Sequence, residues 1–75
     1  MSIPKHSVMI EGHRTSISLE KEFWILLKSI AEKKKVTVSE LITDIDANRK
    51  GGLSSALRVF VLETVLKQAL PNSGN

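Results

Sequence analysis

The chain has 75 residues and no cysteine, so it has room for one small, marginally stable domain and excludes a disulfide framework or a thiolate metal site. A hydrophobic share of 41% excludes a disordered polar segment, and no apolar run forms a secretory signal or reaches the roughly 18 residues of a membrane span, so a folded, mostly helical and cytoplasmic protein is expected. The net charge of +3 lies in residues 1–36, whereas residues 37–75 are neutral, a bias compatible with a polyanionic partner.

The first segment, residues 1–12, has no helical period, contains Pro4 and ends in a plausible turn at Glu11-Gly12. We interpret it as an N-terminal arm, and the sequence leaves open whether Val8–Ile10 adds a strand. From His13 the residues alternate between two sets, with Thr15, Ile17 and Leu19 in one set and Arg14, Ser16 and Ser18 in the other. This period of two predicts a half-buried strand with one polar face.

The next two segments have helical periodicity. Apolar residues at helical spacing between Phe23 and Ala31 predict a first helix over residues 20–35, whose acidic start and basic end suit the helix dipole. Thr37 and Glu40 have the spacing of a capping box, which predicts a second helix from there to about Asn48. The buried stripe expected for this helix comprises Val38, Leu41, Ile42 and Ile45.

The C-terminal third of the chain predicts a third helix after Leu53, with Ser54 or Ser55 as its N-cap. Its apolar residues occupy more than one stripe, so this helix must be covered on more than one side. We therefore divide the chain into an arm (1–12), one domain (13–70) and a loose tail (71–75).

A single strand in a helical chain needs a partner strand, because it cannot pair its own backbone groups. Val8–Ile10 is the other extended candidate, but the same strand of a second copy is the most economical partner, and dimerisation is also the stabilising device left to a small chain without cysteine. An antiparallel pair would bury Ile17 and Leu19 against the helices and expose the polar face of both copies. Such a two-stranded ribbon fits the major groove of DNA.

Two stretches of sequence carry a family resemblance. Residues 13–50, with the run Arg14-Thr-Ser-Ile-Ser-Leu and the segment Val36-Thr-Val-Ser-Glu, resemble the ribbon-helix-helix superfamily of the phage Arc repressor and the methionine repressor. The longer stretch from Gly12 to Leu62 resembles an uncharacterised bacterial ribbon-helix-helix domain family that keeps a third helix. The resemblance implies a mostly α fold with one β-strand, in which an intertwined homodimer places an intermolecular antiparallel ribbon in the major groove of double-stranded DNA.

The resemblance also implies roles for individual residues. Base contacts are assigned to Arg14, Ser16 and Ser18 by their strand positions. The backbone at Val38 and Ser39, with the adjacent Thr37, is assigned to a DNA phosphate, and Lys5 and His13 are further candidates for phosphate contacts. The expected dimer core comprises Ile17, Leu19, Phe23, Leu27, Ile30, Leu41, Ile42 and Ile45. The alternative interpretation of the polar strand face is an ordinary solvated surface, as we expect for Lys33–Lys35.

No grouping typical of an enzyme stands out, and we expect no catalytic site and no cofactor. His6 and His13 lack the companions that a metal site needs, so no metal is expected. Trp24, adjacent to Phe23, is predicted to contact the dimer partner or the third helix rather than a ligand.

Two functions remain open from the sequence. The first is a sequence-selective transcriptional regulator, acting as a repressor, whose dimers bind inverted-repeat sites and can associate along DNA. The second is a protein-interaction module, an antitoxin or adaptor, that holds a partner through Leu57, Phe60 and Val61 of the third helix, with DNA binding secondary or absent. The apolar, helical C-terminal third favours the regulator.

Overall fold

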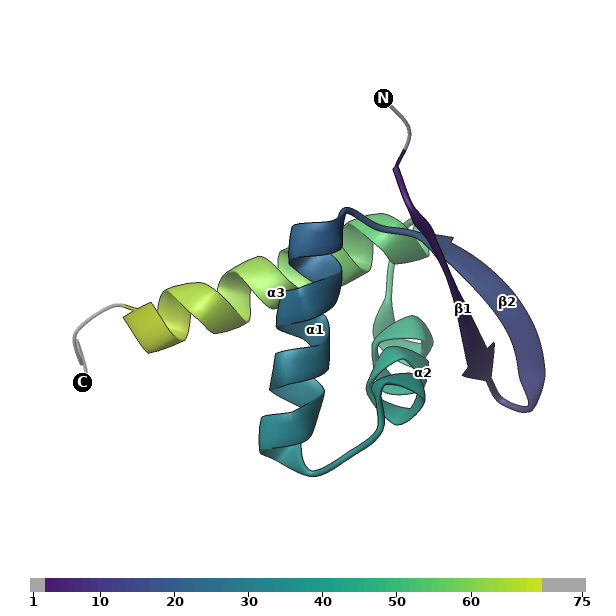
Figure 1. The fold of residues 1–75 in the computed structure, drawn as a ribbon, viewed down its shortest axis with the longest axis horizontal. Helices are drawn as coiled ribbons and strands as arrows, with labels where there is room; N and C mark the ends of the chain where they lie inside the picture. Colours follow the sequence, from purple (N-terminus) through teal and green to yellow (C-terminus); the bar gives the residue numbers. More distant parts are fainter. Residues whose placement is uncertain (1–2, 70–75) are drawn as a thin grey trace.

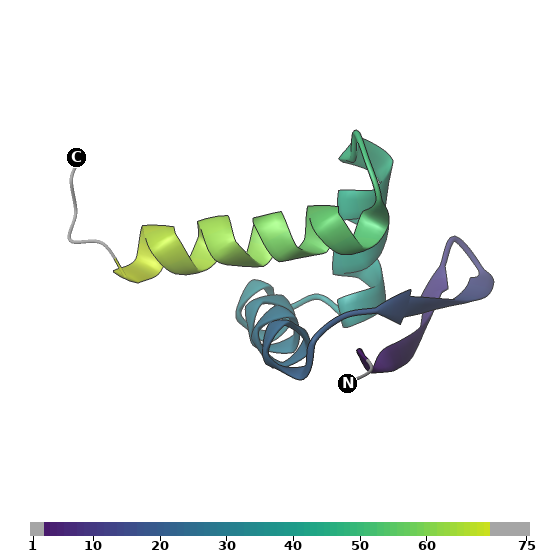
Figure 2. The same cartoon turned by 90° about the horizontal axis from the view of Figure 1, so that it is seen from above.

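The computed structural model describes residues 3–69, and within them the chain forms a β-hairpin followed by three helices (Figure 1). The elements are β1 (Lys5–Ile10), β2 (His13–Ser18), α1 (Lys21–Lys34), α2 (Val38–Asn48) and α3 (Leu53–Ala69). In the view from above, α1 lies to one side of α3, the N-terminal end of α3 crosses α2, and the C-terminal half of α3 extends beyond both (Figure 2). The predicted fold class, a ribbon followed by three helices, is confirmed, whereas the predicted tail at 71–75 lies outside the described residues.

The hairpin closes through a two-residue turn. Glu11 and Gly12 both have positive φ, at 50° and 81°, which is the backbone of the tight turns that match the twist of paired strands. The strands are antiparallel, with Ile10 opposite His13 and Lys5 opposite Ser18. Pairing continues beyond the strands, where Leu19 N–H donates to the carbonyl of Pro4 at 3.0 Å.

The source of the second strand differs from the prediction. β2 pairs with β1 of the same chain, so the antiparallel ribbon is intramolecular, and the chain has two strands where the sequence predicts one. The sequence leaves open whether Val8–Ile10 forms a strand. It does, as part of the longer strand β1. Val8 is 6% exposed and belongs to the core, which anchors β1 to the helices.

We expect Gly12→Ala to destabilise the protein by about 1–2 kcal/mol, since a Cβ at left-handed φ meets its own backbone. Nothing else opposes the substitution, because an added Cβ would have no neighbour within 4 Å. Gly51→Ala is the matched control, with equally open space and no positive φ. Urea unfolding of the three proteins measures the difference, and equal losses for both variants would contradict this account of the turn.

The observed bounds of α1 and α2 agree with the bounds predicted from the sequence to within one residue at each end. α1 ends at Lys34 and is capped by Lys35, which has φ 62° and donates its N–H back to the carbonyls of Ala31 and Glu32. α2 begins with the complete capping box: Glu40 N–H donates to Thr37 Oγ1 at 3.0 Å, and Thr37 N–H donates to Glu40 Oε1 at 2.8 Å.

α3 begins one residue earlier than expected, at Leu53, so Ser54 and Ser55 lie inside the helix and the prediction of either as N-cap is wrong. The first helical bond runs from Ala56 N–H to the carbonyl of Gly52. Ser54 instead donates its hydroxyl hydrogen to the carbonyl of Ser18, with the two oxygens 2.7 Å apart, and so ties the start of α3 to the end of β2.

An ion pair holds α3 to the start of α1. The guanidinium of Arg58 contacts both carboxylate oxygens of Glu20, at 2.8 and 3.3 Å. Hydrogen bonding from Arg58 lowers the pKa of Glu20. The pair joins residues that are far apart in the sequence and links the N-terminal end of α1 to α3.

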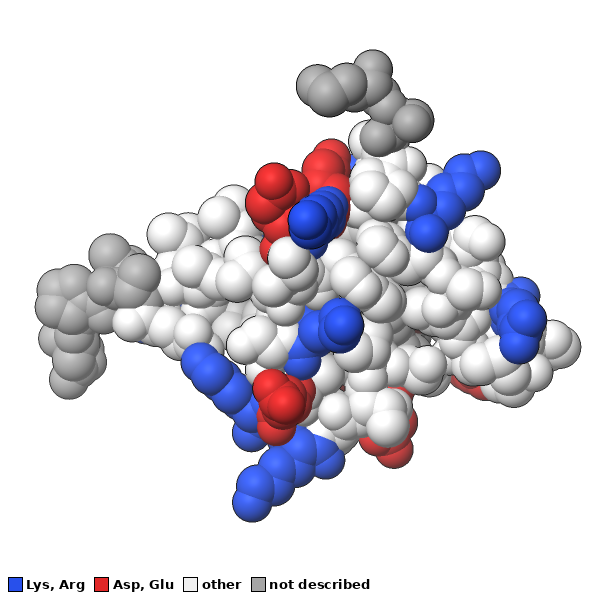
Figure 3. Space-filling view, viewed as in Figure 1, with Lys and Arg blue, Asp and Glu red and all other residues white. Residues whose placement is uncertain are grey.

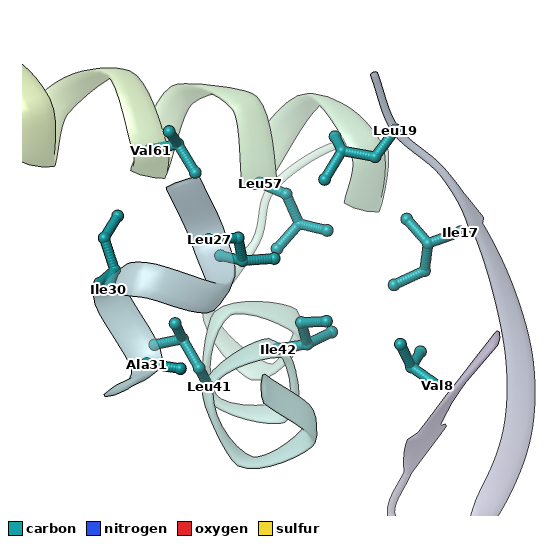
Figure 4. Packing of buried hydrophobic residues seen from close by; sticks show 10 residues of the cluster. All are labelled: Val8, Ile17, Leu19, Leu27, Ile30, Ala31, Leu41, Ile42, Leu57 and Val61. Atoms are coloured by element: carbon teal, nitrogen blue, oxygen red, sulfur yellow. The ribbon is translucent and has the colours of Figure 1, made fainter. Parts of the chain in front are cut away.

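The core lies between the inner face of the hairpin and the three helices (Figure 4). Its buried members are Val8, Ile17, Leu19, Leu27, Ile30, Ala31, Leu41, Ile42, Leu57 and Val61. Six of the eight residues assigned to a dimer core are therefore buried within one chain, and the other two, Phe23 and Ile45, pack partly buried against it. The partner surface predicted on α3 is wrong at Leu57 and Val61, which are 0% and 1% exposed, whereas its third member, Phe60, is partly buried against the core.

Candidate nucleic-acid interface

The hairpin has one face turned away from the helices. Directly opposite residues of an antiparallel pair share a face, so the register aligns Lys5, Ser7 and Met9 of β1 with Ser18, Ser16 and Arg14 of β2. All are exposed except Ser18, which is half-buried. The alternation predicted along residues 13–19 is therefore confirmed: one set of residues forms a polar outer face, and the other set forms an inner face that carries Ile17. We call these six residues the outer face.

The outer face is basic and contains no carboxylate. It carries two cations, Lys5 and Arg14, two facing serines, and the exposed side chain of Met9. Within residues 3–69 the ion pairs are Arg49–Asp46 and Arg58–Glu20, so no acid in this part of the chain holds the guanidinium of Arg14. Its planar donors are free for a ligand such as a guanine edge or a phosphate.

Basic side chains stand on the hairpin's side of the molecule, and a mixed group of basic and acidic side chains lies where α1 ends (Figure 3). The mixed group fits the interpretation of Lys33–Lys35 as a solvated helix end, where cations face the negative end of the helix dipole.

An aromatic stack joins the inner face of the hairpin to α1. His6 stacks on Trp24, with ring centroids 4.1 Å apart and planes inclined by 7°. His6 Nε2 lies 3.2 Å from the carbonyl oxygen of Leu19, a bond that needs a hydrogen on Nε2. Trp24 therefore packs on β1, a neighbour that the sequence did not predict for it.

The N-terminus of α2 lies beside β1. Met9 N–H donates to Ser39 Oγ at 3.4 Å across the outer edge of β1. The capping box occupies the N–H groups of Thr37 and Glu40, whereas those of Val38 and Ser39 have no partner among the described residues. Two free amides at the positive end of a helix can bind an anion.

A shallow hollow joins the outer face to this helix terminus. It is lined by Ser7, Val8, Met9, Arg14 and Ser39. The structure thus brings a predicted base contact, Arg14, next to a predicted phosphate contact, Ser39. Lys5 shares the outer face at its other end, beside Ser18, and His13 is exposed next to the turn.

Sequence reasoning missed Ser7 and Met9, which complete the outer face. The available signal was the two-residue turn Glu11-Gly12 between two extended runs, which favours a hairpin over a free arm. Within the described residues, no group of three or more His, Asp or Glu is placed to hold a metal ion, and no helix is long and apolar enough to cross a bilayer.

Comparison with known proteins gives two matches. A family model described as "Ribbon-helix-helix domain" matches residues 3–65. An uncharacterized protein from Bordetella pertussis Tohama I has a similar solved structure, with a TM-score of 0.74 and 28% sequence identity over 96% of this chain. The match spans 65% of the length of that chain. No curated protein matches the sequence.

Proposed function

Because the chain belongs to the ribbon-helix-helix domain family, whose members are generally DNA-binding transcription regulators, we propose that it is a sequence-selective regulator that represses transcription by occluding a promoter. The reading element is the outer face of the hairpin, inserted into the major groove. Arg14 forms a bidentate bond with a guanine, and Ser16 and Ser18 contact neighbouring base edges. The observation that carries the proposal is the exposed outer face, which contains no carboxylate and on which Arg14 has no acidic partner among the described residues.

Phosphate contacts orient the hairpin on the duplex. The free N–H groups of Val38 and Ser39 receive a phosphate at the positive end of α2. The hollow between Ser39 and Arg14 supports this assignment, because one DNA strand that passes the hairpin would meet both. Lys5 and His13 add phosphate contacts without sequence preference.

The working species in this proposal is a homodimer. Alternation along an antiparallel strand points the backbone groups of Arg14, Ser16 and Ser18 away from β1, and Figure 1 shows β2 at the outer edge of the molecule. Ser54 engages the carbonyl of Ser18, but the groups of Arg14 and Ser16 have no partner among the described residues. Pairing of β2 with β2 of a second copy around Ser16 would place both outer faces side by side, and such a dimer reads an inverted repeat.

Selection of the purified protein against a random pool of duplex DNA tests the function. The salt is held at ~150 mM, because phosphate attraction alone is largely screened there. We expect enrichment of a short motif with two-fold symmetry. No enrichment by a folded protein would refute the regulator, and an asymmetric motif would refute the symmetric dimer.

Glu40 gives a second test, of the phosphate contact. Its carboxylate caps α2 next to the two free amides and repels an incoming phosphate. Glu40→Gln keeps the acceptor of the capping box and removes the charge, so we expect DNA affinity to rise by about 0.5–1 kcal/mol while the helix loses a similar amount of dipole stabilisation. Fluorescence anisotropy at fixed salt measures this. Glu22→Gln, in the first turn of α1, is the matched control, and an equal gain in both variants would contradict the site.

A further inference from the structure

α3 is apolar on two opposite faces. Leu57 and Val61 are buried in the chain's own core. Val59, Leu62 and Leu66 follow the i, i+3, i+7 spacing of a second stripe, and they are 53%, 53% and 47% exposed. At 3.6 residues per turn this stripe lies on the side of α3 away from Leu57 and Val61. We call Val59, Leu62 and Leu66 the outer stripe of α3.

Nothing in the described part of the chain covers the outer stripe. The C-terminal half of α3 extends past α1, and both views show it standing free of the other elements (Figures 1 and 2). Large aliphatic side chains that align on an exposed helix are typical of an interaction surface rather than of a solvated face. The stripe contains no charged residue, so a nucleic acid does not fit it.

Opposite charges border the outer stripe on one side. Glu63 and Lys67 are four residues apart and lie on the same flank of α3, which is the flank that faces the groove between α2 and α3. Neither takes part in the ion pairs of residues 3–69, which are Arg49–Asp46 and Arg58–Glu20. A partner helix that complements this border must place a basic side chain near Glu63 and an acidic side chain near Lys67.

We propose that the outer stripe of α3 binds the same stripe of a second copy, with the two helices antiparallel around a two-fold axis. An axis that passes beside Thr64 sets Leu62 against Leu66 of the partner copy, and Leu66 against its Leu62. The same axis keeps equivalent flanks on one side of the helix pair. With a rise of about 1.5 Å per residue, Glu63 then lies within about 3 Å, along the helix axis, of Lys67 of the partner copy. A single register therefore pairs the leucines of the two outer stripes and also brings the opposite charges of the two copies together.

This contact is separate from the pairing of β2 edges. The hairpin and the free end of α3 lie at opposite ends of the molecule, so one copy can use both surfaces at once (Figure 1). The α3 contact is small, because three aliphatic side chains per copy bury far less than the roughly 1,200 Å² of a standard stable interface. It is therefore a weak contact that joins copies at high local concentration, such as neighbours on one DNA molecule. The inference goes beyond the proposed function and needs no DNA for its test.

Sedimentation equilibrium over a concentration series, without DNA, tests the proposal. We expect the average mass of the wild type to rise with concentration, and Leu62→Glu to lower this mass by at least about two-fold at the highest concentration, because each α3 contact joins two equal units. Ile25→Glu is the matched control, since Ile25 is equally exposed at 53% but lies on α1. Circular dichroism shows whether each variant remains folded.

A charge exchange tests the register independently of folding. Glu63→Lys and Lys67→Glu each set like charges against each other and are expected to reduce association, whereas the double variant Glu63→Lys/Lys67→Glu restores the attraction and the wild-type mass. A wild type whose mass is independent of concentration, or a Leu62→Glu variant that associates as the wild type does, would overturn the contact. Failure of the double variant to recover would overturn the antiparallel register. Because the buffer contains no DNA, none of these results depends on the DNA-binding proposal.

Discussion

Leu57→Ala is expected to lower the free energy of unfolding by about 2–5 kcal/mol, the range for truncating a buried leucine. Leu57 is 0% exposed and belongs to the cluster that joins α3 to the other elements (Figure 4). The lost methyl groups leave a cavity that a rigid helix crossing cannot close. Small domains have little stability in reserve, so the variant is expected to be partly unfolded at room temperature.

Leu62→Ala is the matched control, with the same change five residues later on the same helix. Leu62 is 53% exposed, so its truncation is expected to alter the stability by no more than about 0.5 kcal/mol. Both variants are measured by urea unfolding at low protein concentration, so that association through α3 does not contribute. Trp24, which stacks on His6 across the α1–β1 contact, is a suitable fluorescence probe. Equal stabilities for the two variants would mean that α3 does not pack as the structure shows.

The helices could be predicted from the sequence because their signals are local. The capping box of α2 needs only Thr37 and Glu40, and its two hydrogen bonds form as expected. The start of α3 shows the limit of such signals. Serine is a preferred N-cap residue, but the hydroxyl of Ser54 donates to the carbonyl of Ser18 instead. Ser18 is distant in the sequence and lies near Ser54 only in the folded chain.

The second strand was harder to predict because its alternation is not clean. The inner positions of β1 hold His6, Val8 and Ile10, and the outer positions hold Lys5, Ser7 and Met9, so a polar ring faces inward and a thioether faces outward. His6 tolerates the inner position because its ring stacks on Trp24. That compensation comes from a helix, so the strand sequence alone gives no sign of it.

The outer face follows from the sequence in part. The polar residues Arg14, Ser16 and Ser18 could be placed on one face from their period alone, which holds whichever strand is the partner. The contribution of Ser7 and Met9 depends on the register, which the turn at Glu11-Gly12 fixes. For α3, the sequence shows that more than one side is apolar, but only the tertiary contacts distinguish the face of Leu57 from that of Leu62.

Arg14→Ala is expected to weaken binding to the selected DNA site by about 1–3 kcal/mol, the value of one bidentate arginine–guanine contact. Its effect on random DNA should be small, because a base contact adds little where no guanine is presented. Lys5→Ala should behave differently. A lysine that meets only phosphates loses affinity for every sequence alike, and its removal lowers the salt dependence of binding by about one counterion.

The comparison of specific and random duplexes at several salt concentrations separates these two roles. Arg49→Ala removes the same side chain at the end of α2, where it pairs with Asp46, and controls for the loss of a positive charge. If Arg14→Ala weakened both duplexes equally, Arg14 would be a phosphate contact and the serines and Met9 would have to supply all base discrimination. A selective loss, absent from Arg49→Ala, would instead assign base reading to the outer face of the hairpin.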